Sequence, residues 1–174
     1  MVKEPLRKVL GKAMLTFTEM QTVLTDIEAM INSRPLSYIG DDIDDGAVIT
    51  PAHLAIGRPL GCIPDVRKQD TGVSLSQRYR YQQRVLNHFW QRWLREYLPT
   101  LNMRQKWLKE HDPLKVGDVV LMTDDNLPRS KWNIGKIETT FKGKDGIVRT
   151  VTVKTKAGLY RRPVQKLHLL ERFQ

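Results

Sequence analysis

Nine residues in the C-terminal third of the chain have the types and the spacing to contact a polyanion. Lysine and arginine side chains bind phosphate oxygens, and their binding releases the counterions that surround a nucleic acid. The candidate nucleic-acid-binding residues are Arg129, Lys131, Trp132, Lys142, Lys144, Lys154, Lys156, Arg161 and Arg162. Such clusters favour contact with the phosphate backbone over recognition of base sequence. The alternative is a basic surface that only keeps the protein in solution.

The charge of the chain is unevenly distributed along the sequence. The formal net charge is +10. Residues 1–75 contain 8 basic and 10 acidic residues, a net of −2, whereas residues 76–174 contain 21 and 9, a net of +12. A concentration of positive charge in one region is typical of a surface that binds nucleic acid.

No pattern in the sequence indicates catalysis. There is no phosphate-binding loop, no dinucleotide glycine pattern, no nucleophile elbow and no metal-binding helix with two histidines. The four histidines are scattered, and the single cysteine, Cys62, has no base suggested nearby. Asp26 and Glu28 are interpreted as solvated or ion-paired residues of a helix. We therefore predict no catalytic residue, no metal site, no cofactor and no small-molecule substrate.

The sequence also lacks the signals of a membrane protein. No run approaches the roughly 18 apolar residues that a membrane span requires, and the first twelve residues are too charged for a secretory signal. We expect a soluble, intracellular protein.

The first 60 residues predict two helices. Thr16 and Glu19 have the spacing of a capping box, and apolar residues then recur at helical spacing until Pro35. The acidic run 39–46 is interpreted as a solvated loop. Thr50, followed by Pro51, predicts the start of a short helix over 51–56, and Gly57 predicts its end. A loop or linker is expected from 58 to about 73.

A long basic helix is expected from Ser76, with Pro99 ending it. Its apolar face is broad and rich in aromatic residues, and its arginines lie elsewhere. Because the tryptophans follow the helical period, they are interpreted as packing residues rather than as platforms for bases.

From residue 114 the pattern changes to short strands. We predict strands over 116–122, 132–141, 148–155 and 159–162, with turns at 143–146 and 156–158. Residues 164–170 add a last strand or one helical turn. The fold class is therefore α+β, with a small β-barrel at the C-terminus.

Two sequence blocks carry a resemblance to a known family. The first is "NSRPL" at 32–36, and the second is "ITPAHLAIGRPL" at 49–60. In this order they resemble the end of the integrase core of Pao/BEL-type retrotransposons. A "WQRWLREYL" helix at 90–98 and a "VGDVVL" strand at 116–121 continue the resemblance over nearly the whole chain. The family-motif residues are Asn32, Arg34, Pro35, Thr50, Pro51, His53, Gly57 and Arg58.

This resemblance implies a division into three parts. Residues 1–60 would be the last helices of an RNase H-like core, truncated, residues 61–112 a linker with the basic helix, and residues 113–174 an SH3-like barrel. The catalytic acids, which in the family hold Mg²⁺ or Mn²⁺, would lie upstream, because Glu4 lacks the tryptophan and arginine neighbours of the catalytic glutamate. The fragment itself would not be an enzyme.

The function that the resemblance implies is nonspecific DNA binding and assembly of the integrase multimer during DNA integration. Without the central sheet of the core, the apolar helices predict self-association. The chain would act in the nucleus when it meets chromatin. Alternatives are a protein-interaction scaffold or a chromatin-binding module without direct DNA contact, and a decayed genomic copy without activity.

Overall fold

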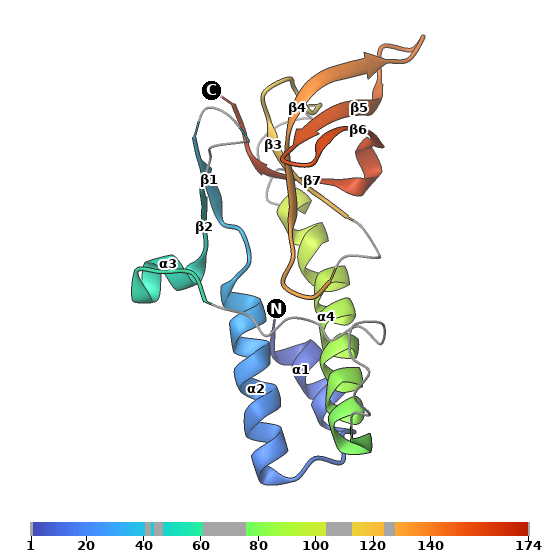
Figure 1. Cartoon of the computed structure of the whole chain (residues 1–174). Coiled ribbons are helices and arrows are strands. Elements are labelled where there is room, and N and C mark those ends of the chain that lie inside the picture. The colour runs from blue at the N-terminus through green and yellow to red at the C-terminus, as the bar shows by residue number, and fades with distance from the viewer. Residues whose placement is uncertain are drawn as a thin grey trace.

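The computed structural model describes residues 2–40, 43, 47–60, 76–103, 113–123 and 128–173. Most of the predicted linker 58–73, including Cys62, lies outside these residues. All of the segment 104–112 lies outside them as well. Helices form the N-terminal part and an antiparallel sheet forms the C-terminal part, so the α+β class is confirmed (Figure 1). No helix within the described ranges is both long and apolar enough to cross a membrane.

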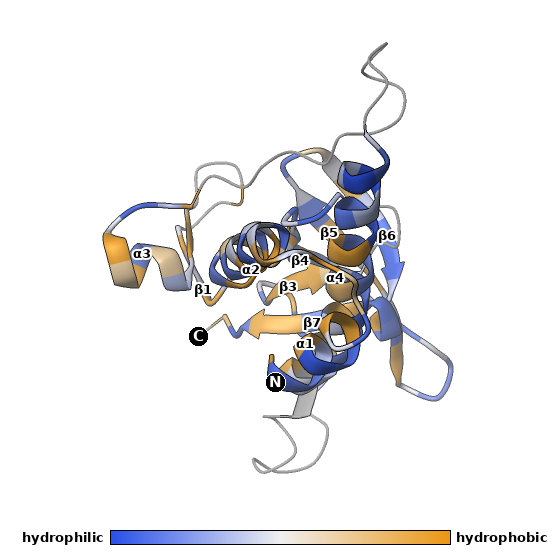
Figure 2. Cartoon of the chain, turned by 90° about the horizontal axis from the view of Figure 1, so that it is seen from below, coloured by the Kyte–Doolittle hydropathy of each residue, from blue (hydrophilic) through white to orange (hydrophobic). Residues whose placement is uncertain are grey.

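Helix α4 (Gln77–Met103) runs from the other helices to the sheet (Figure 1). Helices α1 (Lys3–Leu10) and α2 (Phe17–Asn32) contact it. One continuous core contains Val23 and Ile27 of α2, Phe89 and Trp93 of α4, and Leu121 of the sheet. The apolar sides of these elements face one another in Figure 2. The N-terminal helices and the sheet are thus held on the same long helix.

Helix α4 continues through Pro99, so the prediction that this proline ends the helix was wrong. Proline removes one N–H group and crowds one carbonyl, which weakens a helix without obligatorily ending it. Tyr97 and Leu98, just before Pro99, are buried in the core. Their packing stabilises the turn that the proline weakens.

The N-terminal caps confirm the two predicted helices. Thr16 and Glu19 form the capping box of α2, and Pro51 opens α3 (Pro51–Ile56). Gly57 ends α3 in the left-handed conformation, with φ of +70°, which glycine adopts without strain. Helix α3 projects away from the rest of the molecule (Figures 1 and 2).

The acidic run is not simply a solvated loop. Strands β1 (Ser37–Ile39) and β2 (Ala47–Ile49) pair antiparallel at its two ends. Ile43 is 1% exposed and contacts a cluster that includes Tyr38 and Val119. The burial of Ile43 was not predicted, because its partner Val119 lies in a distant strand. The four aspartates of the run lie outside the described residues.

Five strands form the C-terminal sheet: β3 (Val119–Met122), β4 (Asn133–Lys142), β5 (Val148–Thr155), β6 (Gly158–Pro163) and β7 (Leu167–Glu171). Their order is β6-β5-β4-β3-β7, and all pairs are antiparallel. A 3₁₀ turn, η1 (Val164–Lys166), precedes β7. The sheet is open, because β6 and β7 are its edges in the described residues, so the predicted closed barrel is not confirmed.

The first strand begins at Val119, three residues later than predicted. Residues before it form a tight turn in which Gly117 has φ of +95°. The carboxylate of Asp118, which is fully buried, accepts hydrogen bonds from the backbone N–H of Lys115 (2.9 Å) and of Phe173 (3.3 Å). Asp118 therefore joins the start of the sheet to the end of the chain.

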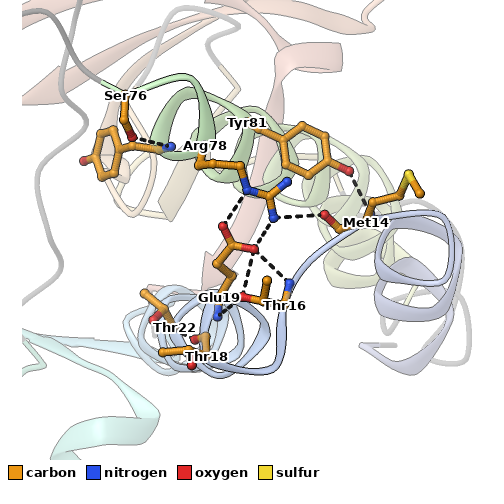
Figure 3. A network of polar contacts seen from close by, with 9 residues as sticks. Met14, Thr16, Thr18, Glu19, Thr22, Ser76, Arg78 and Tyr81 are labelled. Carbon is orange, nitrogen blue, oxygen red and sulfur yellow. Dashed lines mark hydrogen bonds and ion pairs between the residues drawn. The ribbon is translucent and has the colours of Figure 1, made fainter.

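Polar contacts attach the N-terminus of α2 to the start of α4 (Figure 3). Arg78 donates to both carboxylate oxygens of Glu19, with 2.8 Å between Nε and Oε1. Arg78 also donates to the carbonyl of Met14, whose N–H donates to the Tyr81 hydroxyl at 3.0 Å. The hydrogen bonds from Arg78 and from the N–H of Thr16 lower the pKa of Glu19 to about 2.

Candidate nucleic-acid interface

The strand register places a group of basic side chains on one face of the sheet. In β5, Val151 and Val153 are buried in the small core of the sheet, so Thr152 and Lys154 lie on the opposite face. Their cross-strand partners share that face. We call it the outer face and define it by the exposed or half-exposed residues Lys136, Phe141, Thr152, Lys154, Leu159 and Arg161.

Helix α4 covers only one part of the outer face. Ile134, two residues before Lys136 on β4, packs against the core that contains Trp93 of α4. The outer-face residues of β5 and β6 lie farther along the sheet, because these strands are separated from β3 by β4. The basic part of the face is therefore next to the helix but not beneath it.

Two lysines oppose each other directly on this face. Lys136 and Lys154 are cross-strand partners in β4 and β5. Like charges in this position destabilise a sheet, because their Cβ atoms are only about 5 Å apart. The ammonium group of Lys136 lies 4.9 Å from the centre of the Phe173 ring, which orients it.

Arg161 is the third cation of the outer face. Its guanidinium lies over the ring of Phe141, 4.4 Å from the ring centre. This cation–π contact holds the guanidinium at the aromatic ring, and its N–H groups can still donate to phosphate.

The two hairpin turns lie at opposite ends of the sheet. Lys142 and Lys144 are exposed at the β4–β5 turn, and Lys156 is exposed at the β5–β6 turn. Strand β5, which joins these turns, spans about 23 Å. These predicted residues therefore form an extended line with the outer face between its ends, and not one compact patch.

The acid at the β4–β5 turn, Asp145, forms an ion pair within the turn. Asp145 accepts two hydrogen bonds from Arg149, at 2.9 and 2.6 Å. The Arg149 guanidinium lowers the pKa of this carboxyl, so Asp145 stays ionised. This ion pair leaves Lys142 and Lys144 as the turn's positive charges.

Arg129 and Trp132 lie between elements and not on the outer face. Arg129 donates to the side chain of Gln83 on α4. Burial raises the pKa of Asp26 on α2, and the nearby charge of Arg129 offsets part of that rise. Lys131, between them in sequence, is exposed. Arg162, on β6, is opposite Val151 and lies over the ring of Tyr160 at 5.5 Å.

Trp132 belongs to an aromatic cluster that joins the sheet to α4. Its ring meets those of Trp90, Trp93 and Tyr97 edge to face, with centres 5.3 to 6.2 Å apart. Trp93 and Tyr97 stack at 4.8 Å. The prediction that the helix tryptophans are packing residues is confirmed, because Trp90 and Trp93 are buried.

The family-motif residues have local structural roles. Asn32 ends α2, and Arg34 donates to the carbonyl of Ile31 at 2.9 Å. The N–H of Thr50 donates to Nδ1 of His53 at 3.2 Å, which closes the first turn of α3. Pro35 is buried, whereas Arg58 is exposed. Pro51 and Gly57 begin and end α3.

Sequence reasoning missed Lys136 as a candidate residue. Its position opposite Lys154 depends on an irregularity in register between Ile137 and Thr139, which no local pattern indicates.

Within the described residues, no group of three or more His, Cys, Asp or Glu side chains could hold a metal ion.

Comparison with known proteins gives one family match. A model of a family of unknown function, DUF5641, matches residues 77–170. The match begins at the first residue of α4 and ends one residue before the end of β7, so it covers the helix and all but the last residue of the sheet. No curated protein and no solved structure matches the chain. Because the match covers more than half of the sequence, the chain belongs to the DUF5641 family.

Proposed function

We propose that this chain is the noncatalytic C-terminal region of a Pao/BEL-type retrotransposon integrase, which binds DNA without sequence preference. The observation that carries the proposal is the outer face of the sheet, where Lys136 and Lys154 oppose each other and Arg161 lies on the same face. The resemblance of the motif blocks at 32–36 and 49–60 supplies the integrase context. Acting on chromatin, the protein would be intracellular and nuclear.

The sheet supports a finer assignment as an SH3-like domain. Its last strand, β7, pairs with its first, β3, which is the connection that turns a meander back on itself. A single 3₁₀ turn precedes that last strand. These features agree with the small C-terminal barrel that the integrase resemblance implies.

Backbone contact fits the outer face better than base recognition. Lysines supply point charges for phosphates, and Arg161, held over the Phe141 ring, supplies a planar donor. The line of basic residues from the β4–β5 turn to the β5–β6 turn follows a strand of about 23 Å. A strand of duplex DNA presents about seven phosphates over that length.

The test is a titration of the full chain against a fluorescent DNA duplex at several salt concentrations. A variant with Lys136, Lys154 and Arg161 changed to Gln removes three cations from the outer face. If each contacts one phosphate, the plot of log affinity against log salt becomes less steep, and the magnitude of its negative slope decreases by about 2.7. A control with Lys3, Lys12 and Lys166 changed to Gln has the same net charge and keeps the outer face. Equal affinities of the two variants would overturn the proposal.

We also propose that the chain takes part in assembly of the integrase multimer, on the basis of exposed apolar side chains. Phe17 of α2 is 86% exposed and Leu54 of α3 is 73% exposed. Apolar surface of this kind favours contact with another protein chain. We propose that it contacts other integrase chains, including further copies of this one.

The alternative, a chromatin-binding scaffold, requires an aromatic cage for a methylated lysine. Phe141 is opposite Thr150 and Tyr160 is opposite Val153, so the two rings lie on opposite faces of the sheet. Trp132 packs with the aromatic residues of α4. These three rings therefore favour DNA contact over a cage as the function.

A further inference from the structure

One face of α4 is exposed along the described helix from residue 80 to residue 95. The face comprises Arg80, Arg84, Asn87, His88, Gln91 and Arg95. These positions recur three or four residues apart and so lie on one side of the helix. The residues that α4 buries, among them Phe89 and Trp93, lie on the opposite side. We call the exposed side the outward face of α4.

The outward face contains positive charge and no carboxylate. The acid of this part of α4, Glu96, lies outside the face and pairs with Arg92 at 3.3 Å. Arg78, also outside it, is bound to Glu19. Within the described residues no ion pair joins Arg80, Arg84 or Arg95 to an acid. Internal acids thus neutralise the arginines beside the outward face and not those on it.

This arrangement costs the helix stability. Arg80 and Arg84 are one turn apart, and like charges at that spacing destabilise a helix. A surface that serves solubility usually mixes both signs of charge. All five basic residues of α4 are arginines, whose fork of N–H donors matches phosphate better than the ammonium group of lysine does.

The spacing of the arginines fits an extended anion. Arg80 and Arg84 are about 6 Å apart along the helix axis, and Arg95 is about 16 Å farther on. One bound phosphate group cannot reach all three. A duplex presents phosphates at regular intervals along a rigid strand, and Asn87 and Gln91 between the arginines add neutral donors of the kind that contact phosphates.

We propose that the outward face of α4 is a second contact surface for the phosphate backbone of duplex DNA, separate from the outer face of the sheet. The inference rests on the proposed function for its ligand class, but it assigns different residues on a different element. With two such surfaces, one chain would hold a longer stretch of duplex than the sheet alone can hold. It could also hold two separate stretches.

The experiment compares four forms of the full chain in the same fluorescence titration with a 20-base-pair duplex and a single strand of equal length. They are the wild type, the outward-face variant with Arg80, Arg84 and Arg95 changed to Gln, the outer-face variant of the sheet, and the control with Lys3, Lys12 and Lys166 changed to Gln. Both test variants and the control lose three positive charges. All substituted residues are exposed or half-exposed, and circular dichroism melting verifies that each variant remains folded.

We expect the outward-face variant to bind the duplex at least tenfold more weakly than the control. The negative slope of its log affinity against log salt should be smaller in magnitude than that of the wild type by about 2.7. An outward-face variant equal to the control, beside a weakened outer-face variant, would overturn this inference and leave the sheet proposal standing. The reverse pattern would support the inference and remove the sheet site. A stronger effect on the single strand than on the duplex would contradict the duplex assignment. Failure of the wild type to bind either DNA at low salt would overturn both proposals.

Discussion

At the scale of single residues, two carboxylates hold the connections between segments. Asp118 joins the turn before β3 to the residue after β7, and Glu19 joins α2 to α4 through Arg78. Their partners are backbone N–H groups or an arginine within the chain, so their contribution is to stability.

Replacing Asp118 with Ala should destabilise the sheet by roughly 2 kcal/mol, because the N–H groups of Lys115 and Phe173 lose their acceptor. Urea unfolding followed by tryptophan fluorescence measures the change. The control is Glu138→Ala at an exposed position, which should change the free energy of unfolding by less than about 0.5 kcal/mol. A loss for Asp118→Ala no larger than this control would contradict the structural role of Asp118.

Glu19 gives the folded state a dependence on acid pH. Its pKa falls from 4.5 to about 2 on folding, so the ionised form stabilises the fold fully above pH 4.5. That stabilisation is lost as the pH falls from 4.5 towards 2. Melting temperatures measured across this range should fall less steeply for Glu19→Gln than for the wild type. Parallel curves would show that the contact with Arg78 contributes nothing.

At the scale of elements, the junction between α4 and the sheet depends on aromatic packing. Trp132 comes from the segment before β4, and the rings that it meets come from α4. His168 of β7 is also buried in this region, where its Nε2 lies 3.0 Å from the hydroxyl of Thr123. Burial lowers the pKa of His168, so the folded state favours the neutral ring.

Replacing Trp93 with Ala should destabilise the protein by about 3 to 5 kcal/mol, because the side chain is 1% exposed and stacks on Tyr97. Differential scanning calorimetry should show one cooperative transition at a much lower temperature. The matched control, Leu159→Ala, removes an apolar side chain that is 60% exposed and should have little effect. An equal loss of stability in both variants would contradict the central position of Trp93 in the core.

The fold could be predicted from sequence where local signals decide it. Thr16 and Glu19, Pro51 and Gly57, and the alternating valines of β5 each specify structure within a few residues, and their elements were predicted closely. The burial of Ile43 and the pairing of Lys136 with Lys154 depend on distant partners. Sequence analysis assigned no element to α1, where Pro5 lies within the first turn. The arginines of α4 were seen, but their exposure became clear only from what covers the helix.

At the scale of the whole molecule, the N-terminal helices carry several exposed apolar side chains, and further ones lie in the C-terminal part. Phe17 and Leu24 of α2 and Leu54 and Ile56 of α3 are all at least 41% exposed. The DUF5641 match begins only at α4, so these helices lie outside the region that defines the family. The proposals of self-association and of DNA contact therefore concern different parts of the chain.

Changing Phe17, Leu54 and Ile56 to Ser should reduce self-association, because it removes exposed apolar area without touching the core. Sedimentation velocity over a range of protein concentrations measures the effect. A control with Val116 and Leu159 changed to Ser alters exposed apolar residues near or within the sheet and should leave the association unchanged. A wild type that stays monomeric at every concentration would contradict the assembly proposal.

The contact of the β1–β2 hairpin with the end of β7 also bears on aggregation. Strand β7 is an edge of the sheet, and Glu171 on it accepts hydrogen bonds from the Ser37 hydroxyl (2.8 Å) and the Tyr38 N–H (3.0 Å). The opposite edge, β6, ends in Pro163 and contains two arginines, features that discourage a foreign strand from adding to it. The β1–β2 hairpin covers the end of β7 and so protects this edge in a comparable way, although the hairpin lies outside the family region. A version of the protein without its first 60 residues would expose that edge, and fibre-like stacking of sheets would then compete with folding during expression.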